Sequence, residues 1–240
     1  MDPKTIEYYN FEGSEIAKRY ESVPSPVARY FSQSFHPGSS ILEIGLGSGR
    51  DLAVLHACGY EVLGIEPSTK LRQVALQFHP ELEGRIIEGS LPNLTVGQGC
   101  FDAVLCSAVL MHIPSGQLFD AAIQIRDVLK SNGRLLLSLP LNRGDVHSDH
   151  RDPKGRLFSP YTPEQIETLF TRLGFVLISR WDSDDAMCRA ETTWFTQLFE
   201  YRALAGVRPL DQIEAVLNRD RKEATYNQTG PLNPLANKRD

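Results

Sequence analysis

The sequence has few cysteines, and none of them lies in the paired spacing of metal or redox motifs. The four cysteines of the 240-residue chain are Cys58, Cys100, Cys106 and Cys188, and no two of them form a CxxC pair. Zinc sites and disulfide frameworks use clustered or paired cysteines. We therefore expect no bound metal and four reduced thiols in a cytoplasmic protein, with Cys58 and Cys106 buried in apolar runs.

Long apolar runs and an excess of positive charge are missing as well. No apolar run approaches the roughly 20 residues that a membrane-spanning helix needs, and no charged-then-apolar leader begins the sequence. The net charge is −5, which argues against a general nucleic-acid-binding surface. We expect neither a membrane nor a nucleic acid as partner, and the sequence predicts no oligomeric state.

Apolar segments alternate with helical patterns from residue 41 onward. Five short apolar segments predict parallel strands, and they lie at residues 40–45, 60–67, 84–90, 101–108 and 133–140. Helical patterns lie between them, at residues 51–59, 69–80 and 116–133, and the last is expected to end at Gly133. This alternation is typical of βαβ units with right-handed crossovers. It predicts an α/β fold with a doubly wound, Rossmann-like sheet.

The pattern changes after the fifth predicted strand. Residues 162–175 predict a helix capped by Thr162, and residues 175–182 predict a strand. Residues 191–201 form either a last strand or an apolar helix, and their β-branched and aromatic side chains favour a last strand that completes a hairpin. We divide the chain into an N-terminal helical cover over the sheet's edge (1–40), a main domain (41–205), and a C-terminal helix and tail (206–240).

The stretch ILEIGLGSGRD, residues 41–51, puts an acid inside an apolar strand and then three glycines at alternate positions. A glycine loop that opens a helix offers backbone N–H groups to an anion and lets a ligand touch the main chain. The GxGxG spacing of Gly45, Gly47 and Gly49 differs from the GxGxxG dinucleotide pattern, and no GKS or GKT follows. Glu43 would repel a pyrophosphate but attracts an ammonium group, so the stretch favours an amino-acid head group.

A second acidic residue indicates another part of the bound ligand. Glu66 ends the second predicted strand, 21 residues after Gly45. An acid at that place accepts hydrogen bonds from both hydroxyls of a ribose. S-adenosylmethionine (SAM) is the common metabolite that combines a ribose with an amino acid, so we predict SAM as the cofactor.

These motifs resemble those of the class I SAM-dependent methyltransferases. The similar segments are, in order, ILEIGLGSG, GIEPS, EGSLPNL, FDAVLCSAVLMHI and RDVLKSNGRLLLSL. The resemblance covers roughly residues 10–200. It implies a three-layer αβα domain whose sheet has seven strands, the last of them antiparallel, and it implies a SAM-dependent methyltransferase.

The resemblance also implies a place for each part of SAM. Glu43 and the loop from Gly45 to Gly49 would hold the methionine part, and Glu66 would hold the ribose. Pro67 and Ser68 would line the adenine.

Further positions follow from the later motifs. Ser90 stands where the family often has an aspartate that contacts the adenine amine, and Leu91 would stack on the adenine ring. Cys106 and Ser107 would lie beside the methionine part and the methyl group. Tyr20 would lie near the sulfonium, where cation–π attraction contributes about 0.5–2 kcal/mol.

The methyl acceptor is open to more than one interpretation. The segment CSAV stands where some family members have an NPPY-like tetrapeptide that grips amide or exocyclic amine nitrogens. We therefore expect a small-molecule acceptor; a protein or RNA acceptor, or a non-catalytic SAM-binding partner or sensor, are the alternatives. His112 follows the fourth predicted strand and is the candidate general base, with a purely structural histidine as the alternative.

A polar segment, residues 142–158, leaves the carboxyl end of the fifth predicted strand. Ligands bind at that end of open α/β sheets. We therefore expect this segment to be a mobile cover over the acceptor. It contains two histidines and several aspartates, which we expect to be solvated and not metal ligands: His147, His150, Asp145, Asp149 and Asp152.

Overall fold

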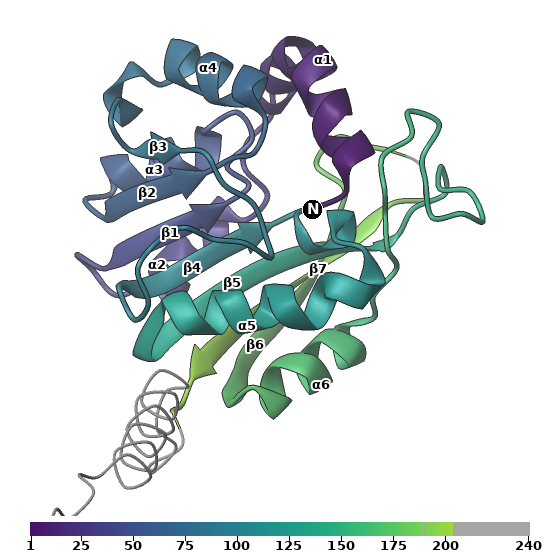
Figure 1. Ribbon diagram of the computed structural model, residues 1–240. Coiled ribbons are helices and arrows are strands. Elements are labelled where there is room, and N and C mark those ends of the chain that lie inside the picture. Colours follow the sequence, from purple (N-terminus) through teal and green to yellow (C-terminus); the bar gives the residue numbers. More distant parts are fainter. Residues whose placement is uncertain (190, 204–240) are drawn as a thin grey trace, which may run out of the picture. The chain divides into compact units, whose positions relative to one another are not determined.

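The computed structural model describes residues 1–189 and 191–203, and these build a seven-stranded sheet in the order β3-β2-β1-β4-β5-β7-β6 (Figure 1). The strands are β1 (Ser40–Ile44), β2 (Glu61–Ile65), β3 (Ile86–Ile87), β4 (Phe101–Ser107), β5 (Leu129–Asn142), β6 (Phe175–Asp184) and β7 (Thr193–Tyr201). β1 to β5 pair in parallel, and β7 pairs antiparallel with both β5 and β6. The predicted Rossmann-like sheet with an antiparallel last strand is confirmed.

Two of the helices begin at capping signals that the sequence shows. They are α1 (Pro3–Glu21), α2 (Phe31–Ser34), α3 (Arg50–Ala57), α4 (Thr69–Phe78), α5 (Leu118–Val128) and α6 (Pro163–Arg172). Ser68 caps α4 by accepting a hydrogen bond from the Leu71 amide. Thr162 and Gln165 form a reciprocal capping box at the start of α6. Such caps satisfy backbone N–H groups that have no partner within the helix.

Helices cover both faces of the sheet, which gives three layers. Successive β1 residues point to opposite faces because side chains alternate along a strand. Leu42 belongs to the core that contains Ile125 of α5 and Phe170 of α6. Ile41 belongs to the core on the other face, with Leu52 of α3. Burial of both faces explains why the strands consist of nearly unbroken apolar runs.

Two local predictions are wrong. The helix expected to continue to Gly133 ends at Val128, because Leu129 already has extended backbone and pairs with Phe101 of β4. Asn132 has a left-handed φ of 63°, which breaks any helical continuation. Cys58 is exposed, since it lies in the turn that ends α3 and not on the buried face of that helix.

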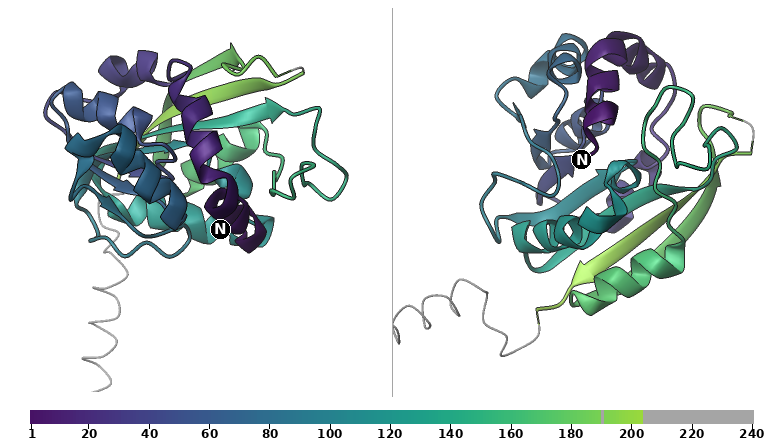
Figure 2. Two further views of the ribbon diagram at one scale, coloured as in Figure 1. Left: turned by 90° about the horizontal axis from the view of Figure 1, so that it is seen from above. Right: turned by 45° about the vertical axis from the view of Figure 1, so that its right-hand side comes forward.

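α1 packs along α4, as both views of Figure 2 show. Gly13 sits in the middle of α1, and a Cβ there would lie 3.0 Å from Lys70 Cγ of α4. The missing side chain therefore permits the close approach of the two helices. The described chain forms one compact unit, Met1–Arg202. The proposed boundaries at residues 40 and 205 stay a prediction, and the predicted C-terminal helix lies outside the described residues.

Candidate functional site

A large cavity opens where β1, β2, β4 and β5 end, and α1 and the 142–158 segment form further walls. Its volume is about 1260 Å³, open mouth included. Seven of the predicted site residues line it: Tyr20, Glu43, Gly45, Gly47, Glu66, Ser107 and His112. Segments far apart in the sequence thus meet at the carboxyl edge of the sheet.

The glycine loop needs its glycines for geometric reasons. Gly45 has a φ of 73°, and a Cβ there would lie 2.5 Å from Val109 Cγ2. The Gly45 amide donates to Ile65 O at 2.7 Å, which holds the loop against the end of β2. Gly47 also has a left-handed φ, of 59°. Side chains at these positions would strain the backbone and fill the cavity.

Glu66 holds the glycine loop and the start of α4 together. Its Oε2 accepts a hydrogen bond from the Gly47 amide at 3.1 Å, and its Oε1 accepts one from the Ser68 amide at 2.9 Å. Burial raises the pKa of Glu66 to about 7, although the two amides oppose the shift. Each carboxylate oxygen still has acceptor capacity for one further donor from the cavity.

Two more acids lie beside it. Glu43 and Asp51 are buried and line the cavity. Burial, and for Glu43 also the neighbouring Asp51 charge, raises the pKa of both carboxyls. Glu43 Oε2 has no hydrogen-bond partner among the described residues. An unpaired carboxylate oxygen in a buried position is costly unless a ligand donates to it.

Arg50 is the cation nearest to these acids. Its Nη1 donates to the carbonyl groups of Tyr20 and Val23, so it ties the end of α1 to the start of α3. Its Nε lies 3.5 Å from Asp51 Oδ1. We call Glu43, Asp51 and Glu66, together with Arg50, the acidic side of the cavity. The sequence interpretation missed Arg50 and Asp51, although both directly follow the glycine loop.

Six predicted cofactor contacts do not line the cavity, and their roles stay predictions: Gly49, Pro67, Ser68, Ser90, Leu91 and Cys106. Gly49 precedes α3 with a φ of 85°, and a Cβ there would lie 3.2 Å from Ala75. Ser68 Oγ is engaged by its cap on α4 and by Asn10. Leu91 and Cys106 are fully buried in the core. Burial raises the pKa of the Cys106 thiol to about 12, which keeps it protonated.

The other side of the cavity carries three arginines and several aromatic rings. Arg143 lies over the Phe158 ring at 3.9 Å, and Arg189 lies over the Trp194 ring at 5.9 Å. Arg156 lies 5.2 Å from the Phe158 ring centre. We call these five residues the arginine side. Each of its arginines also pairs with one aspartate, in the pairs Arg143–Asp145, Arg156–Asp152 and Arg189–Asp185.

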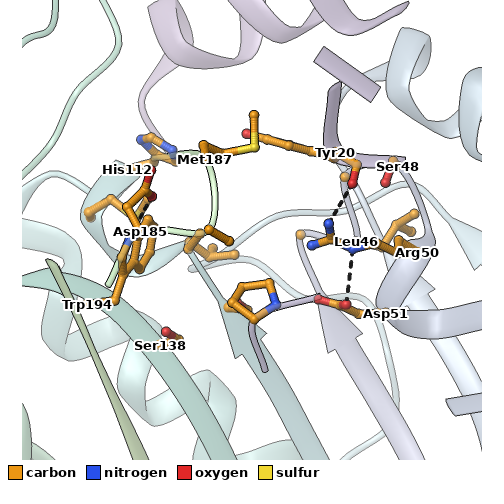
Figure 3. Close-up of a pocket in the computed structure, with 18 of the residues that line it drawn as sticks. Tyr20, Leu46, Ser48, Arg50, Asp51, His112, Ser138, Asp185, Met187 and Trp194 are labelled. Atoms are coloured by element: carbon orange, nitrogen blue, oxygen red, sulfur yellow. Dashed lines mark hydrogen bonds and ion pairs between the residues drawn. The ribbon is translucent and has the colours of Figure 1, made fainter. Parts of the chain in front are cut away.

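Figure 3 shows Arg50 and Asp51 of the acidic side across the cavity from Trp194 of the arginine side. Tyr20, Arg50 and Asp51 lie on one side, and Asp185 and Trp194 lie on the other. The arginine side comes from two segments, the predicted cover at residues 142–158 and the stretch from Arg189 to Trp194, and no local sequence signal joins the two. A ligand that spans the cavity would meet carboxylates at one end and guanidinium groups with aromatic rings at the other.

His112 lies on the wall of the cavity and is 2 % exposed. Its Nδ1 lies 2.6 Å from Leu157 O, and its Nε2 lies 3.2 Å from the Tyr9 hydroxyl. Burial lowers the pKa of His112 to about 4, although the Leu157 carbonyl opposes the shift. His112 is therefore neutral near pH 7, and both of its ring nitrogens have partners.

The comparisons with known proteins identify the family. A family model described as "Methyltransferase domain" matches residues 16–180, more than half of the chain. The chain belongs to this methyltransferase family. The predicted membership in the class I SAM-dependent methyltransferases is thereby confirmed.

Individual relatives agree with that family. An uncharacterized methyltransferase of Alkaliphilus oremlandii is 27 % identical over 53 % of this chain and 56 % of its own length. Protein-L-isoaspartate O-methyltransferase 2 of Rhodopseudomonas palustris is 34 % identical over 46 % of this chain and 55 % of its own length. The chain thus spans about half the length of the curated relatives it matches.

Solved structures share the methyltransferase fold. The 1,6-didemethyltoxoflavin-N1-methyltransferase of Burkholderia thailandensis, solved with its substrate and S-adenosylhomocysteine, superimposes with a TM-score of 0.66. It is 15 % identical, and the match covers 82 % of this chain and 88 % of that one. The [4+2]-cyclase SpnF also has a TM-score of 0.66 at 14 % identity, over 85 % of this chain and 98 % of that one.

The acidic side fits the cofactor of a class I methyltransferase. SAM carries two positive groups, an ammonium and a sulfonium, and the cavity offers the unpaired Glu43 oxygen beside the Asp51 carboxylate. Glu66 has free acceptor capacity at the end of β2, where this fold places a ribose. Within residues 1–189 and 191–203, no cluster of three or more potential ligand side chains could hold a metal ion. In the same part of the chain, every helix is too short or too polar to cross a membrane.

Proposed function

We propose that this chain is a SAM-dependent methyltransferase that acts on a small-molecule acceptor in the cytoplasm. The observation that carries the proposal is one cavity with two chemically different sides. The acidic side suits a cationic nucleoside, and the arginine side suits a second, flat or polar molecule. SAM supplies a methyl group that its sulfonium already activates for transfer.

The acidic side would bind and orient the cofactor. Glu66 would accept hydrogen bonds from the ribose hydroxyls while its backbone partners keep the carboxylate in place. Glu43 and Asp51 would face the ammonium group. The bare backbone at Gly45 and Gly47 would let the methionine part lie against the main chain.

The arginine side would hold the acceptor and exclude water. Trp194 and Phe158 provide apolar surfaces, and their ring contacts with arginines fix the guanidinium groups in place. Holding two reactants in line inside a dry pocket supplies much of the barrier reduction for such a transfer. The predicted role of His112 as general base stays a prediction, and its Nε2 is already engaged by Tyr9.

A transfer assay with isotope-labelled SAM tests the proposal. We expect label from the methyl group in low-molecular-weight products when the protein is mixed with a metabolite extract. Glu66→Ala is the matched negative variant, because it removes the predicted ribose contact at the far end from the acceptor. Label in protein or RNA instead would favour the macromolecular alternative. SAM binding without any labelled product would favour a non-catalytic sensor.

A further inference from the structure

Three side chains of the cavity wall meet at one hydroxyl group. Tyr9 of α1 lies 3.2 Å from His112 Nε2, and Arg156 Nη1 lies 3.3 Å from the Tyr9 oxygen. All three residues line the cavity. The segment 142–158 thereby meets α1 directly beside the arginine side. The Leu157 amide also donates to Thr5 Oγ1, at 2.9 Å, which holds this arrangement in place.

The partners of His112 determine where its hydrogen lies. A backbone carbonyl can only accept, so the nitrogen that faces Leu157 O, Nδ1, must carry the hydrogen. A neutral imidazole then has a lone pair and no hydrogen at Nε2. The charged groups nearest to the ring are Arg156, Arg143 and Asp152, and the two arginines disfavour an imidazolium. The Tyr9 hydroxyl is therefore the donor in its contact with Nε2.

Arg156 occupies one acceptor position of the Tyr9 hydroxyl oxygen. A guanidinium can only donate, so the Tyr9 oxygen accepts from Arg156 while its own hydrogen is committed to His112. A hydroxyl oxygen has two lone pairs, and one of them remains. Towards a molecule in the cavity, Tyr9 can therefore only accept a hydrogen bond.

We propose that Tyr9 binds the methyl acceptor and selects a nucleophile that still carries a hydrogen, a hydroxyl or an N–H group. The inference rests on the proposed function and names its substrate class. In the transfer, a lone pair of the acceptor would form the new bond to the methyl carbon, and the electron pair of the broken C–S bond would stay on sulfur. The hydrogen of the acceptor would leave as a proton to water. A thioether, a fully substituted amine or an ether would place a lone pair against the Tyr9 oxygen. His112 and Arg156 are positioning residues, because they act through the polarity that they impose on Tyr9.

Four variants separate this role from a structural one. Tyr9→Phe removes the acceptor oxygen. His112→Gln keeps a side-chain oxygen where Nε2 was and preserves the polarity, whereas His112→Asn retains a group near Nδ1 and releases the Tyr9 hydrogen. Tyr8→Phe is the matched control, since the Tyr8 ring lies 5.6 Å from Tyr9 but is not part of the cavity lining in the described chain.

Nitrogen NMR of the histidine ring tests the geometry without any substrate. We expect His112 in the free protein to be neutral with its hydrogen on Nδ1. Tyr9→Phe should move the Nε2 resonance and leave Nδ1 in place, and Tyr8→Phe should move neither. A hydrogen on Nε2, or an Nε2 resonance that ignores Tyr9→Phe, would overturn the inference.

The labelled-SAM products test the selectivity. We expect the new methyl group on an oxygen or nitrogen that carried a hydrogen. Tyr9→Phe and His112→Asn should lower kcat/KM for the acceptor about tenfold or more. His112→Gln should recover part of the activity that His112→Asn loses, and Tyr8→Phe should stay close to wild type. SAM affinity should be unchanged in all four variants.

Two results would contradict the selectivity: a product methylated at an atom that had no hydrogen, or a Tyr9→Phe enzyme as active as Tyr8→Phe. If the extract yields no labelled product at all, the proposed function fails. The NMR result then still decides the polarity of Tyr9.

Discussion

Removal of the Glu66 carboxylate should weaken SAM binding in a pH-dependent way. Each oxygen of Glu66 already accepts one backbone amide, at 3.1 Å from Gly47 and 2.9 Å from Ser68, and each keeps capacity for one ribose hydroxyl. Hydrogen bonds to a charged group contribute about 1.5–3 kcal/mol. We therefore expect Glu66→Ala to raise the Kd of SAM roughly 10- to 150-fold at pH 8.

The raised pKa of Glu66 should make the affinity of the wild-type protein for SAM depend on pH near neutrality. With a pKa of about 7, the carboxyl is mostly ionised at pH 8 and mostly protonated at pH 6. If SAM binds the ionised form, its affinity falls about tenfold between these two pH values. The proton linkage of Glu66 should disappear in Glu66→Ala and in Glu66→Gln, which retains the shape of the side chain. Other acids, such as Glu43, add a pH dependence of the SAM affinity that is the same in the wild type and in both variants.

Calorimetry with SAM and with S-adenosylhomocysteine at pH 6 and pH 8 measures both effects. Glu88→Ala is the control, because Glu88 lies near the end of β3 with its side chain 74 % exposed and pairs with Arg72. It should leave the Kd unchanged at both pH values. An unchanged Kd for Glu66→Ala at pH 8 would refute the assignment of Glu66 to the ribose.

Three further predictions follow from particular contacts. Gly45→Ala should lower the free energy of unfolding, measured with urea, by ~1–3 kcal/mol or more, because its Cβ would clash with Val109. Gly59→Ala, which has a similar φ of 84° and nothing within 4 Å of its Cβ, should lower the free energy of unfolding by less. Because burial keeps His112 neutral down to a pH of about 4, only the unfolded chain binds a proton there between pH 6.5 and 4. The free energy of unfolding should therefore fall by about 3 kcal/mol as the pH falls from 6.5 towards 4, and His112→Gln should abolish that loss. Hydrogen exchange in residues 142–158 should slow when cofactor and acceptor bind. Arg151→Met, which removes the 2.8 Å ion pair with Asp2, should speed this exchange in the free protein. Strong protection of residues 142–158 in the ligand-free wild type would contradict the predicted mobile cover.

Much of the sheet could be predicted from local sequence, because each strand and helix carries its own signal. The apolar run before Gly45 marks β1, and the pair Thr162 and Gln165 marks the start of α6. Glu43 near the end of β1 and Glu66 directly after β2 point to the cofactor without any knowledge of the fold. The start of β5 was predicted too late because Leu129 continues the apolar period of α5, and only its pairing with β4 makes it a strand.

The arginine side could not be predicted as a whole, because its residues are far apart in the sequence. Arg143 and Arg156 lie in the predicted cover, residues 142–158, but Arg189 lies in a different segment, and only the folded chain brings all three to one cavity. Tyr9 carries no sequence signal either. Its helix, α1, contains Gly13 at its centre, which weakens local helical preference, and the contact with α4 compensates.

A crystal structure of the protein with bound S-adenosylhomocysteine tests the central claim most directly. The account predicts one molecule per chain, with both ribose hydroxyls on the Glu66 carboxylate and the amino group within hydrogen-bond distance of Glu43. The sulfur atom should face the part of the cavity that Tyr9 and the arginine side enclose. A nucleoside bound away from Glu66, or a sulfur atom turned away from Tyr9, would contradict the account.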